Sequence, residues 1–296
     1  MMNKTIATYI QYLKSKGLAA NTLESYQRDL KQAMAFFEKE RQINEWEKVD
    51  QYAIMDLVNN LKGRDRSAAT INRLLSALRR FYRYLICHRG LRFNPLELVD
   101  NIQPATPQAP EILTESETQR LLRAPDSTTL LGCRDHVMLL VMAATGMRVS
   151  ELVQLSLKDL HLDIQMVRSG AGSKQERLIP LSTVASGSLQ EYLTRVRKKL
   201  ARPGEDAVFM NAHGHRLTRQ GVWKNLKQLV KVAQIDKAVT PQTLRYSFAV
   251  RLLNNGADSR LIQAMLGYSE MRMLKPYLKM SPQEMVNSYR QHQPRL

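Results

Sequence analysis

With 296 residues, the chain is long enough for one large domain or two ordinary ones, and 44% hydrophobic with 24% charged residues excludes a disordered polypeptide. The two cysteines, Cys87 and Cys133, exclude a disulfide framework and favour a cytoplasmic location. Lysine and arginine outnumber acidic residues 44 to 27, and the net charge of +17 predicts a polyanionic partner, with nucleic acid the first choice. A ribosome-associated protein or a merely basic surface stays open on composition alone.

The first 102 residues read as helical throughout. The first 18 lack a continuous apolar run, so we expect neither a signal peptide nor a membrane span. Asn21 is predicted to cap a helix, with Glu24 three residues later as in a capping box.

The clearest helix of this region runs from about Ser67 to Cys87. Its apolar stripe is spaced by three and four residues and comprises Ile71, Leu74, Leu75, Leu78, Tyr82 and Leu85. A basic face accompanies the stripe and suits a helix laid along a DNA groove. From this basic face we predict that four arginines bind DNA, namely Arg66, Arg73, Arg80 and Arg83. For any one of these arginines, an ordinary solvated position is the alternative.

A linker follows, because residues 101–110 contain three prolines and no charge. We therefore expect a helical DNA-binding domain over residues 1–102, a linker over 103–112 and a second domain over 113–296. Both domains are basic, which indicates that both contact the same polyanion.

The second domain begins with a predicted capping box at Thr114 and Glu117. An apolar helix over residues 137–144 is expected to end at Gly146, and a new helix to start at Arg148. Residues 165–181 predict a β-hairpin with a glycine-rich turn, after which the chain is again mostly helical.

Four segments of this domain carry the chemistry when taken together. They are Thr-Gly-Met-Arg-Val-Ser-Glu-Leu at 145–152, Gly-Ser-Lys-Gln-Glu-Arg at 172–177, Thr-Pro-Gln-Thr-Leu-Arg-Tyr-Ser-Phe-Ala at 240–249, and Leu-Gly-Tyr-Ser at 266–269 followed by Tyr277. In this order they resemble the tyrosine recombinase (phage integrase) family, in particular its Xer-like and transposon-resolvase-like members. The resemblance covers nearly the whole chain.

The resemblance assigns a role to each matching position. The family's two arginines fall on Arg148 and Arg245, its hairpin lysine on Lys174 and its nucleophile on Tyr277. Two positions depart from the family's histidine or tryptophan, since Gln242 and Tyr268 stand there. The predicted catalytic set is Arg148, Lys174, Gln242, Arg245, Tyr268 and Tyr277, while Arg177 is a structural residue or a phosphate contact.

Phosphodiester chemistry explains why these residue types belong together. Charge builds on the non-bridging oxygens in the transition state, and planar guanidinium groups stabilise it with paired hydrogen bonds. A tyrosine attacks and forms an ester, and a lysine of lowered pKa protonates the leaving oxygen. Glu151 lies one helical turn from Arg148 and could orient it, although ordinary pairing on a helix surface is the simpler explanation.

The resemblance implies a mainly α fold, in which a helical N-terminal domain and a mostly helical catalytic domain with a small antiparallel sheet form a C-shaped clamp on DNA. It further implies a homotetramer on two specific inverted-repeat sites, a 3′-phosphotyrosine and a Holliday junction. Accessory DNA-binding proteins are left open, as are cointegrate resolution, replicon-dimer resolution and integration.

No cofactor is expected. The pair His213 and His215 lacks a third ligand at useful spacing, and no phosphate-binding Gly-x-x-x-x-Gly-Lys loop is present. Because Gln242 and Tyr268 keep a hydrogen-bond donor but lose an imidazole, a DNA-binding regulator with a lapsed active site is the alternative function. A type IB topoisomerase is a further alternative, disfavoured by the compact helical N-terminal domain.

Overall fold

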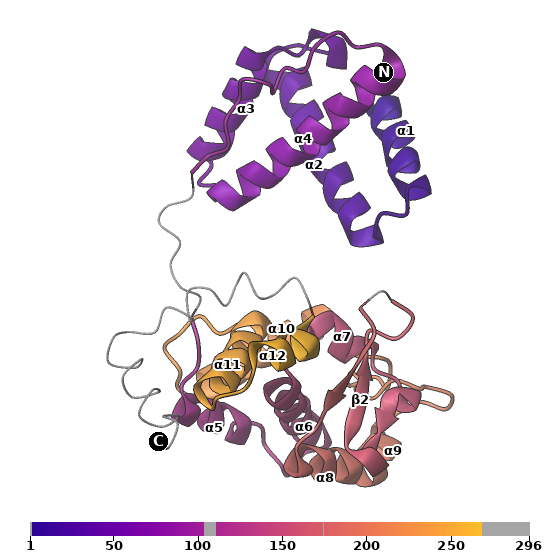
Figure 1. The fold of residues 1–296 in the computed structure, drawn as a ribbon, viewed down its shortest axis with the longest axis vertical. Helices are drawn as coiled ribbons and strands as arrows, with labels where there is room; N and C mark the ends of the chain where they lie inside the picture. The colour runs from indigo at the N-terminus through magenta and orange to yellow at the C-terminus, as the bar shows by residue number, and fades with distance from the viewer. Residues whose placement is uncertain (1, 104–110, 174, 268–296) are drawn as a thin grey trace, which may run out of the picture. The chain divides into compact units, whose positions relative to one another are not determined.

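The computed structural model describes residues 2–103, 111–173 and 175–267, apart from the side chain of Ser259. The chain divides into two compact units, Met1–Gln108 and Ala109–Leu296. Both are mostly helical (Figure 1), and a short antiparallel sheet belongs to the second. The mainly α class with a small antiparallel sheet is thereby confirmed. Within the described residues, we find no helix with both the length and the apolar character that a membrane crossing requires.

The first unit is built from helices packed around an aromatic centre. Trp46 is buried there and donates from Nε1 to the carbonyl of Met2 at 3.2 Å, while the Tyr82 hydroxyl donates to the Trp46 carbonyl at 3.0 Å. The elements of this unit are α1 (Met2–Ser15), α2 (Ala20–Glu40), the 3₁₀ turn η1 (Trp46–Lys48), α3 (Gln51–Gly63) and α4 (Ala68–Arg89).

The helix predicted from about residue 67 is α4. Ser67 caps it by accepting the amide of Thr70, and Gly90 ends it in the left-handed conformation. Its whole predicted apolar stripe is buried. The predicted cap at Asn21 is wrong, because α2 already begins at Ala20 and Ala19 precedes it without a side-chain cap. The short turn after α1, which reverses at Gly17 with φ +75°, brings the chain into helical geometry early.

The second unit wraps its elements around α6, which is apolar on nearly every side and contacts α5, α8 and α11. A helix buried all round needs no polar face, which is why its sequence shows a continuous apolar run. The helices of this unit are α5 (Glu115–Arg123), α6 (Leu130–Thr145), α7 (Val149–Gln154), α8 (Thr183–Glu191), the π-helix η4 (Tyr192–Arg197), α9 (Lys198–Leu200), α10 (Arg219–Val232), α11 (Pro241–Asn254) and α12 (Ser259–Leu266), with 3₁₀ turns η2 (Leu157–Asp159) and η3 (Leu162–Ile164).

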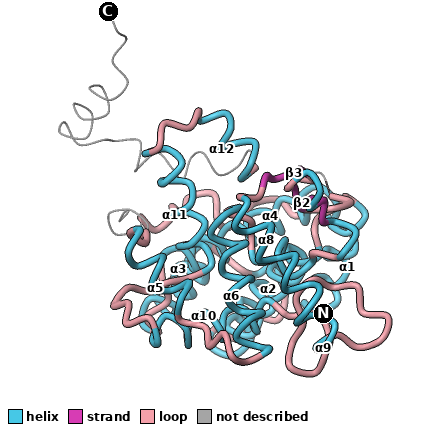
Figure 2. Tube along the Cα trace, turned by 90° about the horizontal axis from the view of Figure 1, so that it is seen from below, coloured by secondary structure: helices cyan, strands magenta, loops and turns pink. Residues whose placement is uncertain are grey.

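The predicted hairpin forms as β2 (Met166–Ser169) and β3 (Arg177–Pro180), in antiparallel register with Val167 opposite Ile179. A two-residue strand, β1 (Leu160–His161), adds to the other edge of β2 and was too short to predict. Figure 2 shows how small this sheet is beside the helices. The hairpin contributes Val167 and Ile179, both fully buried, to the hydrophobic core of the second unit.

Candidate active site

Gly146 ends α6 and turns the chain sharply toward the site. Its φ is +61°, and a β-carbon there would lie 2.4 Å from the Cδ1 atom of Phe248 on α11 and 2.8 Å from Leu266 at the end of α12. Only glycine fits both the left-handed backbone and this close packing. The turn therefore delivers Arg148 to the start of α7 beside α11 and α12.

Arg148 is held by the carboxylate of Glu151 one turn along α7. Its Nη1 donates to Oε1 of Glu151 at 3.0 Å, and its own backbone amide donates to Oε2 at 2.7 Å. Arg177 of β3 binds the same carboxylate with two nitrogens, at 2.8 and 3.0 Å. Glu151 is therefore a buried carboxylate shared by two guanidinium groups, and the prediction that Glu151 contacts Arg148 is confirmed.

The electrostatics of Glu151 follow from these contacts. Burial acts to raise the pKa of the Glu151 carboxyl, but the hydrogen bonds from Arg177 and from the Arg148 amide, with the charges of both arginines, outweigh it and lower the pKa. Glu151 thus stays ionised, which fixes both guanidinium groups in place.

The hairpin turn and α12 are tied to the same centre. Gln175 accepts from Nη1 of Arg148 at 3.0 Å, which places the turn of the hairpin beside that arginine. Arg177 donates from Nε to the carbonyl of Met265 at 2.6 Å. Lys174 lies outside the described residues, but its neighbour Gln175 contacts Arg148.

Arg245 joins the remaining two segments. It lies on α11, which starts at the capping residue Thr240 followed by Pro241, and its side chain is 1% exposed. Its guanidinium donates to the carbonyls of Gly146 and Leu266. A buried charge of this kind needs full hydrogen bonding, so Arg245 locks the ends of α6 and α12 against α11.

A cavity of about 720 Å³ lies where the first residues of α7, α10 and α11 meet, and it is called here the Arg148 cavity. Two arginines, two glutamines and a tryptophan are among the side chains that line it, beside apolar surface. Its lining residues are Arg148, Val149, Ser150, Arg219, Gln220, Trp223, Pro241 and Gln242. Arg219, Gln220 and Trp223 were not predicted as site residues from the sequence. A usable signal was present, because a tryptophan that is 48% exposed lies between basic residues just after the helix cap Thr218.

The structure brings together every predicted site residue of the second unit that it describes. Arg148 and Gln242 line one cavity, while Arg177 and Arg245 fasten its surroundings. Tyr268 and Tyr277 lie outside the described residues, as does the C-terminal tail. Among the described residues, no group of three or more histidine, cysteine, aspartate or glutamate side chains is placed to hold a metal ion.

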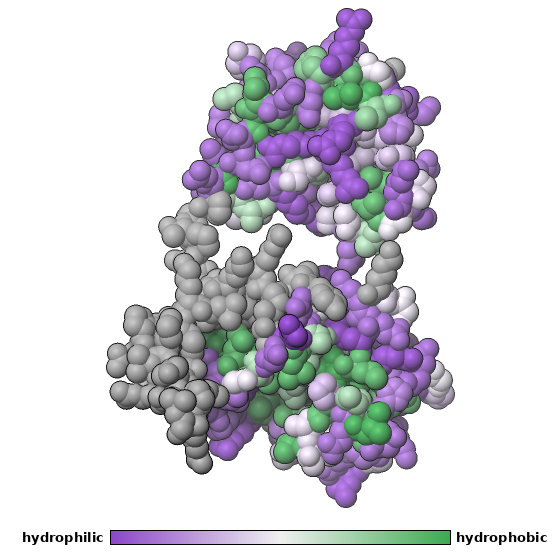
Figure 3. Space-filling model, in the orientation of Figure 1, coloured by the Kyte–Doolittle hydropathy of each residue, from purple (hydrophilic) through white to green (hydrophobic). Residues whose placement is uncertain are grey.

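The predicted DNA-binding arginines of the first unit differ in their contacts. Arg73 is 2.9 Å from the buried carboxylate of Asp29, and burial raises the pKa of that carboxyl while Arg73 opposes the rise. Arg66, Arg80 and Arg83 are exposed. Figure 3 shows hydrophilic side chains over most of the visible face of this unit.

Comparison with known proteins agrees with the geometry of the site. Residues 111–284 match the Phage integrase family, and residues 6–89 match the Phage integrase N-terminal SAM-like domain. The chain is 35% identical over 297 residues to tyrosine recombinase XerD of Listeria innocua and 38% identical over 296 residues to XerD of Lacticaseibacillus casei. Each of the two alignments covers 99% of this chain and 100% of the relative.

Solved structures show the same fold. XerA recombinase is 25% identical with a TM-score of 0.55 and full coverage of both chains. The Tn1549 transposon integrase in complex with circular intermediate DNA is 20% identical with a TM-score of 0.77, covering 97% of this chain and 98% of that chain. From the two family matches and the full-length relatives, the chain belongs to the phage integrase family of site-specific tyrosine recombinases.

Proposed function

We propose that this recombinase cuts and rejoins duplex DNA through a 3′-phosphotyrosine formed by Tyr277, and that the scissile phosphate sits in the Arg148 cavity. One observation carries the proposal: segments that lie about a hundred residues apart converge on this cavity, with Arg148 and Gln242 in its wall. The relatives are called tyrosine recombinases, and the Tn1549 integrase structure contains DNA.

The proposed mechanism uses side chains that the structure describes together with three residues outside the described part of the chain, Lys174, Tyr268 and Tyr277. Arg148 and Arg245 stabilise the charge on the non-bridging oxygens, and Gln242 donates one neutral hydrogen bond. Lys174, next to Gln175 on the hairpin turn, protonates the leaving 5′ oxygen, while Tyr268 donates a hydroxyl. Glu151 and Arg177 are positioning residues, because Arg177 is bound to Glu151 and to the Met265 carbonyl.

The arrangement on DNA is also a proposal. We assign DNA binding to a helical domain over residues 1–102 and catalysis to 113–296, joined by the linker 103–112 as two arms of a clamp. Four protomers assemble on two inverted-repeat sites and exchange strands through a Holliday junction in the cytoplasm. The chemistry fits cointegrate resolution, dimer resolution and integration equally, with or without accessory DNA-binding proteins.

Trapping of covalent DNA tests this proposal. A duplex selected by binding of the full chain is nicked close to the cleavage position, so that the cleaved end diffuses away and the ester accumulates. We expect a covalent band on a denaturing gel for the parental chain and complete loss of it for Tyr277→Phe, with DNA binding unchanged because one hydroxyl is removed.

Tyr246→Phe is the matched control, since Tyr246 is buried in the core of the second unit and its loss removes a hydroxyl elsewhere. A covalent band that persists in Tyr277→Phe moves the nucleophile to another tyrosine, Tyr268 first. A parental chain that binds its site yet forms no band identifies a lapsed enzyme that acts by binding alone.

A further inference from the structure

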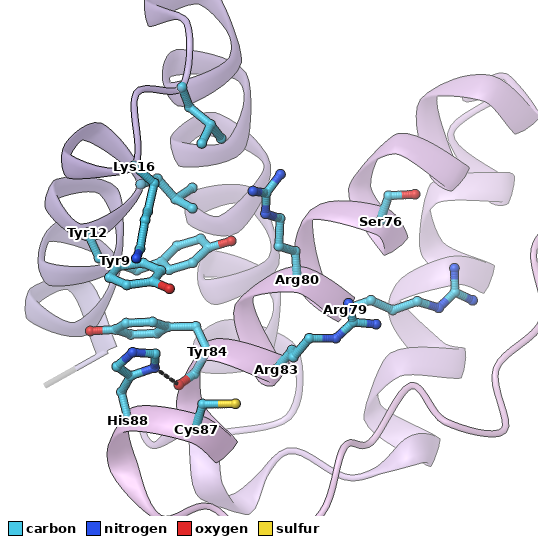
Figure 4. Close-up of a pocket in the computed structure, with 12 residues that line it drawn as sticks. Tyr9, Tyr12, Lys16, Ser76, Arg79, Arg80, Arg83, Tyr84, Cys87 and His88 are labelled. Carbon is cyan, nitrogen blue, oxygen red and sulfur yellow. Dashed lines mark hydrogen bonds between the residues drawn. The ribbon is translucent and has the colours of Figure 1, made fainter.

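A second basic concavity lies in the first unit, away from the residues of the proposed chemistry. It is a hollow of about 690 Å³ between α1 and α4, called here the α1–α4 hollow. Lys16, in the turn that follows α1, lines it together with Arg80 and Arg83 of α4 (Figure 4). Three cationic side chains therefore line one hollow.

None of these three cations is paired with a carboxylate among the described residues. Within the described part of the first unit, the ion pairs are Lys39–Glu40, Arg41–Asp56, Lys48–Glu45 and Arg73–Asp29. Arg79, which also lines the hollow, is occupied by the Val99 carbonyl and by Oδ1 of Asn101 at 2.6 Å. The charges of Lys16, Arg80 and Arg83 consequently remain available to an anion.

Arg80 and Arg83 are three residues apart on α4, so their stems are neighbours on the helix surface. Like charges at this spacing repel and destabilise a helix by a few tenths of a kcal/mol per pair. An anion bound between the two guanidinium groups attracts both of them and so offsets their mutual repulsion. Two neighbouring arginines without a carboxylate are therefore suited to share an anion.

Aromatic rings contact two of the three cations, Lys16 and Arg80, without cancelling their charge. The ammonium of Lys16 lies 5.6 Å from the ring centroid of Tyr12, and Cζ of Arg80 lies 5.9 Å from that of Tyr26. The ring of Tyr84 on α4 makes tilted contacts with two rings of α1, 4.9 Å from Tyr12 and 5.0 Å from Tyr9 between centroids. Cation–π contact orients a charged group but leaves its hydrogen-bond donors free for a ligand.

Tyr9 adds a second sign of a missing partner. Its ring is fully buried at the floor of the hollow, and its hydroxyl has no hydrogen-bond partner among the described residues. Burial raises the pKa of this hydroxyl, so it stays protonated and can only donate or accept as a neutral group. Buried hydroxyls without partners are rare in folded proteins and commonly mark a site that a ligand or water completes.

We propose that the α1–α4 hollow is a phosphate-binding site, which takes one phosphate group of the DNA backbone between Arg80 and Arg83 with Lys16 as a third counter-charge. This rests on the proposed function, which makes duplex DNA the polyanion. The proposal adds Lys16 to the predicted DNA-binding residues. It assigns phosphate binding to Arg80 and Arg83, whereas Arg73 is paired with Asp29.

The test combines protein variants with neutralised DNA phosphates. The full chain and the variant with Lys16→Gln, Arg80→Gln and Arg83→Gln are titrated with a selected duplex in which single phosphates are replaced by methylphosphonates. We expect one position in each half-site where replacement weakens binding of the parental chain about ten-fold but leaves binding by the variant unchanged, because the two changes remove the same contact.

Salt dependence gives an independent readout. Loss of Arg80 and Arg83 together should lower the slope of log affinity against log salt by about 0.9, the value for one phosphate, rather than twice that. Lys14→Gln with Arg89→Gln is the matched control, since both side chains are exposed on α1 and α4 and neither lines the hollow. An equal fall of slope in this control overturns the site in favour of diffuse charge.

A free phosphate is the other source of the same ligand. Inorganic phosphate is therefore added to the full chain without DNA, and the thermal midpoint is recorded for the parental chain and the triple variant. Stabilisation of the parental chain alone, with no sensitive methylphosphonate position, assigns the hollow to a free anion and rejects the DNA backbone. Absence of both effects rejects the phosphate site, while the covalent band formed by Tyr277 tests the proposed function separately.

Discussion

The arginines of the two units are used in opposite ways. In the first unit Arg80 and Arg83 are exposed and bind no carboxylate among the described residues, so their charge is directed outward. In the second unit Arg245 is 1% exposed and Arg197 is 8% exposed, and both donate to backbone carbonyls. These arginines therefore expose their charge in the first unit and fasten backbone carbonyls in the second.

This difference has a physical reason. Exposed charges attract DNA over long range and respond to salt, but they do not fix a geometry to a fraction of an ångström. Stabilising a transition state requires donors already held in place, because reorganisation during the reaction would cost the energy that catalysis gains. Variants in the two units should accordingly separate binding from chemistry.

The largest expected effect is that of Arg245→Lys. Lysine keeps the charge but lacks the planar fork whose two nitrogens donate to the Gly146 and Leu266 carbonyls, and a buried carbonyl left without a donor costs roughly 1–3 kcal/mol. We expect the single-turnover cleavage rate on a nicked duplex to fall about 10²-fold or more, as for loss of a preorganised donor. DNA affinity, measured in parallel, should change little.

Arg197→Lys is the control for Arg245→Lys. Arg197 is likewise buried and donates to the carbonyls of Ala207 and Glu205, at 2.8 and 2.6 Å, outside the candidate site. It should lower the thermal midpoint to a similar extent while the cleavage rate of the folded protein is retained. If both variants lose cleavage in proportion to stability, Arg245 acts only as a structural anchor.

Periodicity and capping residues were enough to predict much of this fold. Thr114 and Glu117 form the capping box that their spacing indicates, and Gly146 ends its helix in the left-handed conformation. These features depend on neighbours within four residues, so local sequence contains them. The start of α2 was misplaced because the turn at Gly17, not the best capping side chain, decides where that helix begins.

Tertiary partners were harder to predict. No local rule indicates that Asp29 neutralises Arg73, or that Trp223 of α10 borders the same cavity as Arg148. The proximity of Arg148 to Gln242 and Arg245 was inferred from family resemblance and not from spacing, because about a hundred residues separate Arg148 from the other two. The sequence alone therefore indicated which residue types matter, and the fold supplied their partners.

A smaller effect is expected for Gln242→Leu in the Arg148 cavity. Gln242 is exposed at the second position of α11 and offers one amide donor. A hydrogen bond to a charged group contributes roughly 1.5–3 kcal/mol, so cleavage should slow about ten- to a hundred-fold, with DNA affinity nearly unchanged. Gln242→His, which keeps a donor, should stay near the parental rate.

Gln190→Leu, at an exposed position of α8, controls for the added apolar surface and should cleave like the parental chain. Single-turnover cleavage is again the measurement. Full activity of Gln242→Leu would remove this amide from the catalytic set. Activity that appears only after Gln242→His would instead identify the parental site as impaired.

The smallest effect concerns stability and its dependence on pH through Glu151. Because the pKa of this carboxyl in the folded chain lies below its ordinary value of 4.5, its ionised form stabilises the fold above that pH. The contribution is lost as the pH falls through the lowered pKa. Glu151→Gln cannot ionise and leaves Arg148 and Arg177 without their shared counter-charge.

We therefore expect Glu151→Gln to lower the thermal midpoint by several degrees near neutral pH, at about 2–4 °C per kcal/mol, and by progressively less toward pH 3. Glu191→Gln is the control, since Glu191 pairs with Arg195 on the surface and both side chains are more than half exposed. Such a pair contributes at most about 1 kcal/mol to stability, so the thermal midpoint of Glu191→Gln should change with pH as that of the parental chain does. A constant offset of Glu151→Gln at every pH would mean that packing of the side chain, rather than its charge, holds the two arginines together.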